Sequence, residues 1–220
     1  ADVYMFANDQ LGDLLKANAI AELSDDAAKQ VKEQNSDSMI QSVTGTDGKL
    51  YGVPFTGNTW FMYYRKSKFT EQDITSLDAM LAKGKVSFPL TNSWYLPAFY
   101  LGVGGSSLFG SKGSDAKAGV NFAKAASVTA YLTKLVANPN FADDSNGSGL
   151  AAVQSGKADA FFSGTWDSEN AKEALGDNYA AAPAPTYTLD GKSVQIKPFS
   201  GSKAIAANPN SKSPEWASKF

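Results

Sequence analysis

Short apolar segments alternate along this chain with segments of helical spacing, and this alternation constrains its fold more than any other feature. Val86 to Leu90 and Ala158 to Ser163 have the length and composition of buried strands. Asn121 to Val136 carries apolar residues along one helical stripe, and Ser168 to Leu175 is a second helical segment that ends at Gly176. Strands that alternate with helices predict an α/β layered fold.

Cap and turn residues predict where several elements begin and end. Asn8 or Asp9 is placed to cap a helix after the first strand. Asn92 is a candidate cap for a helix that contains Pro97, and a proline inside a helix is expected to bend it. The segment GTDGKLYGVPF, residues 45–55, predicts a hairpin with an Asp-Gly turn.

The residue types that are missing narrow the chemistry. The sequence contains no cysteine and no histidine, which excludes thiol nucleophiles, disulfides, Ser-His-Asp triads and zinc sites built from thiolate or imidazole. The net charge is −2 and Arg65 is the single arginine, so no basic stripe is available for nucleic acid. The segment from Asp143 to Gly149 lacks the acid spacing of an EF-hand, and we expect a solvated loop there. No apolar run approaches the roughly 18 residues of a membrane span.

Both ends of the chain fall inside predicted elements. ADVYMFA begins within a strand pattern, and KSPEWASKF ends one turn into a helix with Ser213 as its expected N-cap and Pro214 as its first residue. A natural domain rarely starts and stops in this way, so we interpret the chain as a fragment of a longer protein.

Large aromatic side chains recur beside short polar ones near predicted strand ends. In open α/β sheets, ligands bind outside the carboxyl ends of the strands, where strand-to-helix junctions gather. The bulkiest example is Trp166, on the turn between a predicted strand and a predicted helix. The full set is Phe6 with Asp9 and Gln10, Asn58 with Trp60, Trp94 with Tyr95, and Trp166.

This pairing of rings with amides, acids and hydroxyls suits a carbohydrate. A sugar ring presents an apolar face of C–H groups that packs on indole or phenol, and aromatic area gives hydrophobic gain at a low entropy cost. The hydroxyls of the sugar need short polar side chains, which fix orientation and specificity. The sequence therefore indicates a sugar-binding site in which Trp166 is exposed because a ligand covers it.

Each residue also has a plainer interpretation when it is taken alone. A tryptophan at a junction, such as Trp94 or Trp166, is more often half-buried packing than a binding surface, and Trp60 in a strand is more often core. Asp9 alone is better explained as a helix cap. Only the recurrence of one pattern at three junctions favours a site.

Two other classes of protein stay open on the residues alone. Paired carboxylates can hydrolyse a glycosidic bond, and Asp9, Asp167 and Glu169 are available, although nothing in the sequence shows two of them converging. A structural adhesion module would bury the same aromatic side chains and would have no cleft.

Five segments occur along the chain in an order that is shared with a known family. They are DVYMFANDQLGDLLKANAIAEL, DGKLYGVPFTGNTWFMYYRKSKF, NSWYLPAFYLGVGG, SGKADAFFSGTWD and KPFSGSKAIAANPNSKSPEWASKF. Together they cover nearly the whole chain and resemble the maltose/maltodextrin-binding protein family, the extracellular solute-binding proteins of sugar ABC importers.

The resemblance implies a periplasmic-binding-protein-like α/β fold of type II, with two lobes joined by a hinge that close on sugar. Residues 1–54 and 201–220 would belong to the first lobe, which is incomplete in this chain, and residues 55–200 to the second. The hinge would fall near Pro54–Asn58 and Lys197–Gly201, because a few residues of an extended crossing segment can absorb a rotation.

The resemblance also implies roles for residues near the start of the chain. Phe6 falls where the family often has a sugar-contacting aromatic, and Asp9 falls on its hydroxyl-binding aspartate. Gln10 occupies a position where maltose binders can carry arginine, which implies a changed contact. Asn58 occupies a position where an acid contacts sugar in some members, which implies a different preferred ligand.

For the rest of the chain, the resemblance implies stacking contacts. Trp166, in SGTWD, matches the stacking tryptophan of the family, and Trp94 or Tyr95 lies where another stacking aromatic is expected. We therefore predict a monomeric, non-enzymatic subunit of an ABC importer that binds a maltodextrin-like oligosaccharide and the membrane permease. It would need no cofactor and no metal, and would be exported to the periplasm or the extracellular face of the membrane, free or as a lipoprotein. A glycoside hydrolase is the alternative.

Overall fold

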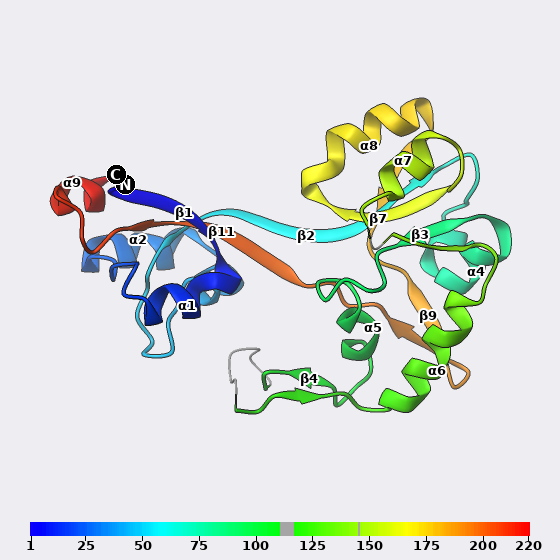
Figure 1. Ribbon diagram of the computed structural model, residues 1–220, viewed down its shortest axis with the longest axis horizontal. Helices are drawn as coiled ribbons and strands as arrows, with labels where there is room; N and C mark the ends of the chain where they lie inside the picture. The colour runs from blue at the N-terminus through cyan, green and yellow to red at the C-terminus, as the bar shows by residue number, and fades with distance from the viewer. Residues whose placement is uncertain (111–116, 145) are drawn as a thin grey trace. The chain divides into compact units, whose positions relative to one another are not determined.

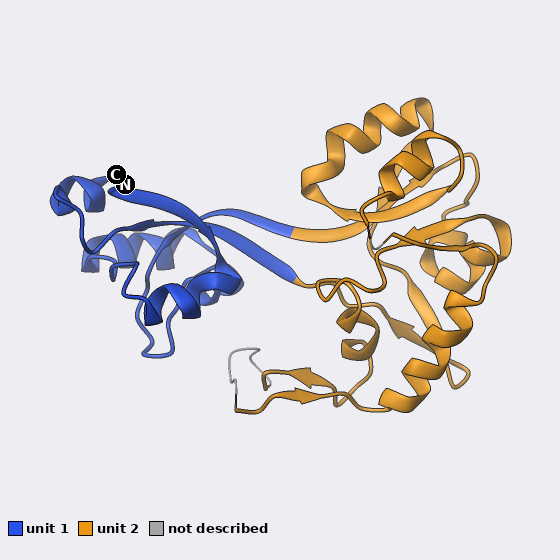
Figure 2. Ribbon diagram, viewed as in Figure 1, with its two compact units in different colours: residues 1–58, 200–220 blue, residues 59–199 orange. Residues whose placement is uncertain are grey.

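The chain divides into two compact units, which are coloured separately in Figure 2. Unit 1 consists of residues 1–58 and 200–220, and unit 2 consists of residues 59–199. The divisions predicted from the sequence lie after residues 54 and 200. The computed structural model describes residues 1–110, 117–144 and 146–220.

Unit 1 is built on an antiparallel pair of strands, β1 (Val3–Ala7) and β11 (Ser200–Ala207). Phe6 lies opposite Ala204 in this pair, and both side chains enter the core of the unit. The remaining elements are η1 (Asn8–Gln10), α1 (Leu11–Lys16), α2 (Asp25–Gln34), α3 (Asp37–Ser42) and α9 (Pro214–Lys219). The buried core consists of Phe6, Leu11, Ile20, Val31, Val43, Leu50, Ala204 and Ala206.

Unit 2 is built on a mixed sheet. β2 (Val53–Arg65), whose first residues belong to unit 1, runs antiparallel to β7 (Ala160–Gly164) and to β8 (Tyr179–Ala182). β3 (Val86–Phe88) runs parallel to β7 and to β6 (Phe141–Asp143). The carboxyl ends of β3, β6 and β7 therefore lie at the same end of the sheet, where ligands bind in open α/β folds.

Helices and short hairpins complete unit 2. The helical elements are η2 (Asp73–Thr75), α4 (Leu77–Lys83), α5 (Pro97–Leu101), α6 (Ala125–Val136), α7 (Gly149–Gln154), η3 (Thr165–Asp167), α8 (Ser168–Leu175) and η4 (Gly176–Asn178). The hairpin strands are β4 (Ser107–Leu108), β5 (Val120–Asn121), β9 (Thr186–Leu189) and β10 (Lys192–Gln195).

The sheet of unit 2 is covered on both faces, and the side chains of β2 alternate between them. Trp60, Met62 and Tyr64 enter a large hydrophobic cluster with residues of α4, α5 and α6. Tyr63 enters a smaller cluster with residues of α7 and α8. Figure 1 shows α7 and α8 together on one side of unit 2. Burial on both faces explains why the strands of this unit are so apolar.

This architecture confirms the predicted α/β fold. α7 and α8 have the bounds that the sequence predicted, and the Asp-Gly turn forms with Gly48 at a φ of 82° beside a bridge between Thr44 and Leu50. Two predictions about where helices begin were wrong. Pro97 begins α5 instead of bending a longer helix, since a proline at the first helical position loses no hydrogen bond. α6 begins at Ala125, because Asn121 pairs with β4.

Candidate functional site

A hollow of about 200 Å³ lies in unit 2 at the carboxyl ends of β3, β6 and β7. Pro89 follows β3, Asp144 follows β6, and Trp166 follows β7. Three strand ends therefore contribute to one site, as the general rule for α/β sheets predicts. The full lining consists of Pro89, Asn92, Tyr95, Asp144, Gly147, Leu150, Phe161, Phe162, Ser163, Trp166 and Asp167.

Trp166 is the most exposed large ring in this hollow. It lies in η3, directly after the fully buried strand β7, and is 51% exposed. A Cβ atom on Gly164 would lie only 2.1 Å from the indole, so the ring packs directly against the backbone of Gly164. The indole is thus fixed by a rigid strand on one side and is open to solvent on the other.

Tyr95 lies in the same hollow and is almost fully buried, at 7% exposure. Burial raises the pKa of Tyr95 to about 12, together with the charges of Asp167 and Asp144, and hydrogen bonding to Ser163 opposes the shift. The phenol therefore stays protonated at neutral pH. It can donate one hydrogen bond and accept others, which suits a ligand rich in hydroxyl groups.

Two carboxylates also line the hollow. The hydroxyl of Ser163 donates a hydrogen bond to Oδ2 of Asp167. Oδ1 of Asp144 accepts a hydrogen bond from the backbone N–H of Gly149 at 2.6 Å, and burial raises the pKa of Asp144 above its ordinary value. The prediction of a solvated loop is therefore wrong for Asp144, which is buried at the end of β6.

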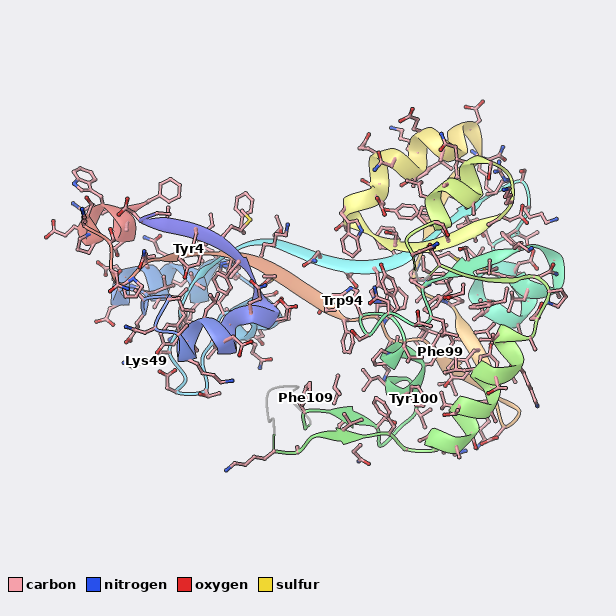
Figure 3. All side chains as sticks on the ribbon, in the orientation of Figure 1. Tyr4, Lys49, Trp94, Phe99, Tyr100 and Phe109 are labelled. Atoms are coloured by element: carbon pink, nitrogen blue, oxygen red, sulfur yellow. The ribbon has the colours of Figure 1, made fainter. Side chains whose placement is uncertain are left out.

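Trp94 is half-buried beside the hollow and is not among the residues that line it. Its ring packs on Phe199, with centroids 5.3 Å apart, and its backbone N–H donates to Oδ1 of Asn92 at 2.8 Å. Figure 3 shows Trp94 on the segment that leads into α5, and Phe99 and Tyr100 on α5 itself. Of the two candidate aromatic residues in this segment, Tyr95 is the one that lies in the hollow.

The other predicted site residues belong to unit 1. Phe6 is 5% exposed and packs in the core, whereas Asp9 and Gln10 are exposed on η1. The prediction that Asn8 or Asp9 caps the following helix is wrong. Both residues lie within η1, where no side chain makes a cap hydrogen bond, and Oδ1 of Asn8 accepts a hydrogen bond from the backbone N–H of Ser202. Oδ1 of Asn58 is buried and has no hydrogen-bond partner among the described residues. The part of these residues in ligand binding stays a prediction.

Several polar residues of the hollow were not predicted as binding residues. Asn92 was assigned to a helix cap, Asp144 to a solvated loop, and Asp167 only to a possible hydrolytic pair, while Ser163 was assigned to a strand. All four lie within a few residues of a strand end. The rule that selected Trp94 and Trp166 would have found them if it had been applied to polar side chains as well.

Of the ring and polar residues selected from the sequence, Trp60 lines one of two larger hollows, and the others line neither. One, of about 720 Å³, is formed in unit 2 by residues 59–61, 181–184 and 195–198, and is largely apolar. The other, of about 410 Å³, lies in unit 1 beside α9 and β11. Within residues 1–110, 117–144 and 146–220, no cluster of three or more acidic side chains could hold a metal ion, and no helix is both long and apolar enough to cross a membrane.

Comparison with known proteins assigns the family. Residues 1–220 match the family described as bacterial extracellular solute-binding protein. Maltodextrin-binding protein MdxE of Bacillus subtilis (strain 168) is 32% identical over 242 residues, which cover 100% of this chain and 55% of that protein. A structure solved with acarbose is 52% identical with a TM-score of 0.93, and the match covers 100% of this chain and 58% of the other.

A second solved structure agrees with this assignment. Maltodextrin binding protein MalE1 from L. casei BL23, without ligand, is 37% identical with a TM-score of 0.89, and the match covers 99% of this chain and 58% of the other. The chain thus spans a little over half the length of these relatives. Because the family match extends over every residue, the chain belongs to the bacterial extracellular solute-binding protein family.

Proposed function

We propose that this protein is the sugar-binding subunit of an ABC importer and that its ligand is an oligosaccharide of the maltodextrin class. The observation that carries the proposal is the hollow of unit 2, in which the open indole of Trp166 lies beside Tyr95 and Asp167. Relatives support the ligand class, because MdxE is a maltodextrin-binding protein and a structure with 52% identity was solved with acarbose, an oligosaccharide.

In this proposal, a glucose ring packs its C–H face on the open side of the Trp166 indole. An apolar ring face on an aromatic surface removes area from water without immobilising many side-chain torsions. The sugar hydroxyls then bond to the groups around the ring, with Tyr95 and Asn92 able to donate and accept, and Asp167 able to accept. This combination of one apolar platform and several short polar groups gives both affinity and orientation.

The predicted residues of unit 1 stay part of the proposal. Asp9 and Gln10 are exposed, so each can meet a hydroxyl group of the sugar. Asn58 stays in the proposal as a buried acceptor, because its Oδ1 has no hydrogen-bond partner among the described residues. Phe6 can contribute only through the small part of its ring that is exposed. We further propose that the protein acts outside the cell membrane, as a monomer, and delivers the sugar to a membrane permease.

Isothermal titration of the full gene product tests the proposal. Maltotriose and longer maltodextrins are expected to bind with a one-to-one stoichiometry, and cellotriose, which has the same composition and a different linkage, serves as the matched control. If no maltodextrin gives a binding heat, even at high protein and ligand concentrations, the proposed ligand class is rejected.

A glycoside hydrolase is the second candidate, because Asp144 and Asp167 line the same hollow. Hydrolysis needs one carboxyl group that is protonated and a second that is charged. Asp144, whose pKa is raised by burial, would be the acid in such a pair. Prolonged incubation with maltodextrins followed by a reducing-end assay separates the two functions, since a binding protein releases no new reducing ends.

A further inference from the structure

Trp60 lies beneath the hollow without lining it. It is fully buried in β2 and stands opposite Gly164, the residue against which Trp166 packs. Directly opposed residues of an antiparallel pair project from the same face of the sheet. Trp60 therefore enters the core on the face where Gly164 leaves room for the exposed indole.

The ring of Trp60 packs against the walls of the hollow. Its centroid is 4.9 Å from that of Tyr95 and 6.0 Å from that of Phe162, and both of these residues line the hollow. Phe88 closes the group with an edge contact at 5.7 Å. Such contacts restrain the position of the Tyr95 ring, because tilted and edge-to-face aromatic pairs have a preferred geometry.

The indole N–H of Trp60 makes a second and more specific connection. It donates a hydrogen bond to the backbone carbonyl oxygen of Trp94 at 3.1 Å. A buried indole N–H needs an acceptor, and in this case the acceptor belongs to an irregular segment and not to a strand or helix. The same segment is tied by the backbone N–H of Tyr95, which donates to the carbonyl of Asn92.

We propose that Trp60 is a positioning residue for sugar binding, which sets the height and angle of the segment 92–95 above the sheet. The inference rests on the proposed function. Asn92 and Tyr95 would contact the ligand, and Trp60 would hold them through its ring and its N–H without touching sugar. Loss of this N–H donor is then expected to weaken sugar binding more than it lowers the free energy of unfolding.

Trp60 can also be explained as ordinary core packing, and the test must separate the two roles. Replacement of Trp60 by 3-benzothienylalanine keeps the bicyclic shape and removes only the N–H donor. Phe99→Leu is the matched control, because Phe99 is fully buried in the same cluster, 5.4 Å from Phe88, and does not line the hollow. Trp60→Phe is a simpler variant if the synthetic residue is not incorporated.

The measurements are maltotriose affinity, thermal stability and amide hydrogen exchange in the full gene product. We expect the benzothienyl variant to bind about threefold to tenfold more weakly, the range for one lost hydrogen bond. Phe99→Leu should lower the melting temperature and leave the affinity unchanged. Wild-type affinity in the benzothienyl variant overturns the inference, and so does an equal loss of affinity in both variants.

Amide hydrogen exchange is measured without ligand, so it tests the position of the segment 92–95 independently of sugar binding. The amides of Trp94 and Tyr95 are hydrogen-bonded within the segment and are expected to exchange faster in the benzothienyl variant than in wild type. If wild type binds no maltodextrin, the proposed function fails, and faster exchange then supports only the part of the inference in which Trp60 holds the segment 92–95 in place. Unchanged exchange rejects it in either case.

Discussion

The change that tests the binding site most directly is Trp166→Ala. A tryptophan side chain presents roughly 250 Å² at most, and Trp166 is 51% exposed, so roughly 125 Å² is available to a ligand. At about 25 cal/mol for each Å², complete covering is worth about 3 kcal/mol, and covering of one ring face is worth about half of that. The dissociation constant for maltotriose is therefore expected to rise by roughly tenfold to 150-fold.

The assay is isothermal titration, which does not depend on the fluorescence of the residue that is removed. Trp166→Phe should give a smaller loss than Trp166→Ala, because a phenyl ring keeps part of the apolar platform. Trp216→Ala is the matched control, since Trp216 is 73% exposed on α9 in unit 1 and lines none of the hollows described above. Its affinity for sugar should equal that of wild type.

Two results would refute the reasoning. The first is an unchanged affinity of Trp166→Ala together with an unchanged far-ultraviolet circular dichroism spectrum, which means that no ligand covers the indole. The second is an equal weakening by Trp216→Ala, which indicates a general effect of removing an exposed tryptophan. Either result would return Trp166 to the plainer interpretation of a half-buried packing residue.

Three other changes test the surroundings of the site and the pH dependence of folding. Gly164→Ala should lower the free energy of unfolding by about 1–3 kcal/mol in urea, because the new Cβ would lie 2.1 Å from the ring of Trp166; an unchanged midpoint contradicts this packing. Asp73→Asn should lower the melting temperature at neutral pH, because hydrogen bonds from Lys83 and Thr70 hold the pKa of Asp73 at about 2, below its usual 3.8. In a pH series of thermal melts, that difference should shrink as the pH falls from about 4 to about 2, because the hydrogen bonds stabilise the charged carboxylate, which becomes protonated over this range. A difference as large at pH 2 as at neutral pH contradicts this prediction. Asn92→Ala should weaken maltotriose binding by about threefold to tenfold in a titration, and wild-type affinity would remove this amide from the site.

The alternation of short apolar segments with helical segments was enough to predict the layered α/β fold, because it records burial on both faces of a sheet. The start of α6 could not be predicted in the same way. Val120–Asn121 is a two-residue strand whose existence depends on Ser107–Leu108, which lies more than ten residues earlier. Similarly, Pro97 fits either a bent helix or a helix start, and packing of the preceding segment decides between them.

Some features of the candidate site could be predicted from the sequence, and others could not. The exposure of Trp166 could be predicted, because a large ring on a turn between a buried strand and a helix has little core within reach to bury it. Which of Trp94 and Tyr95 lines the hollow could not be predicted, since adjacent residues in an irregular segment have no periodicity to separate them. The burial of Asp144 could not be predicted either. Its segment is polar in sequence, and Asp144 lines the hollow only because β6 pairs with β3 in the folded chain.

The exposure of the Trp166 indole is unfavourable for the stability of the free protein. Trp166 leaves about half of its surface in water, although Gly164 and the buried strand β7 hold it in a fixed place. A residue needed only for packing would gain roughly 1.5–3 kcal/mol by turning into the core, and the central position of β7 in the sheet of unit 2 offers core on both faces. A rigid support beneath an open ring is what pre-organised binding requires, since little ordering entropy remains to be lost when a ligand arrives. Under the proposed function, the same geometry accounts both for the fixed position of the ring and for its exposure.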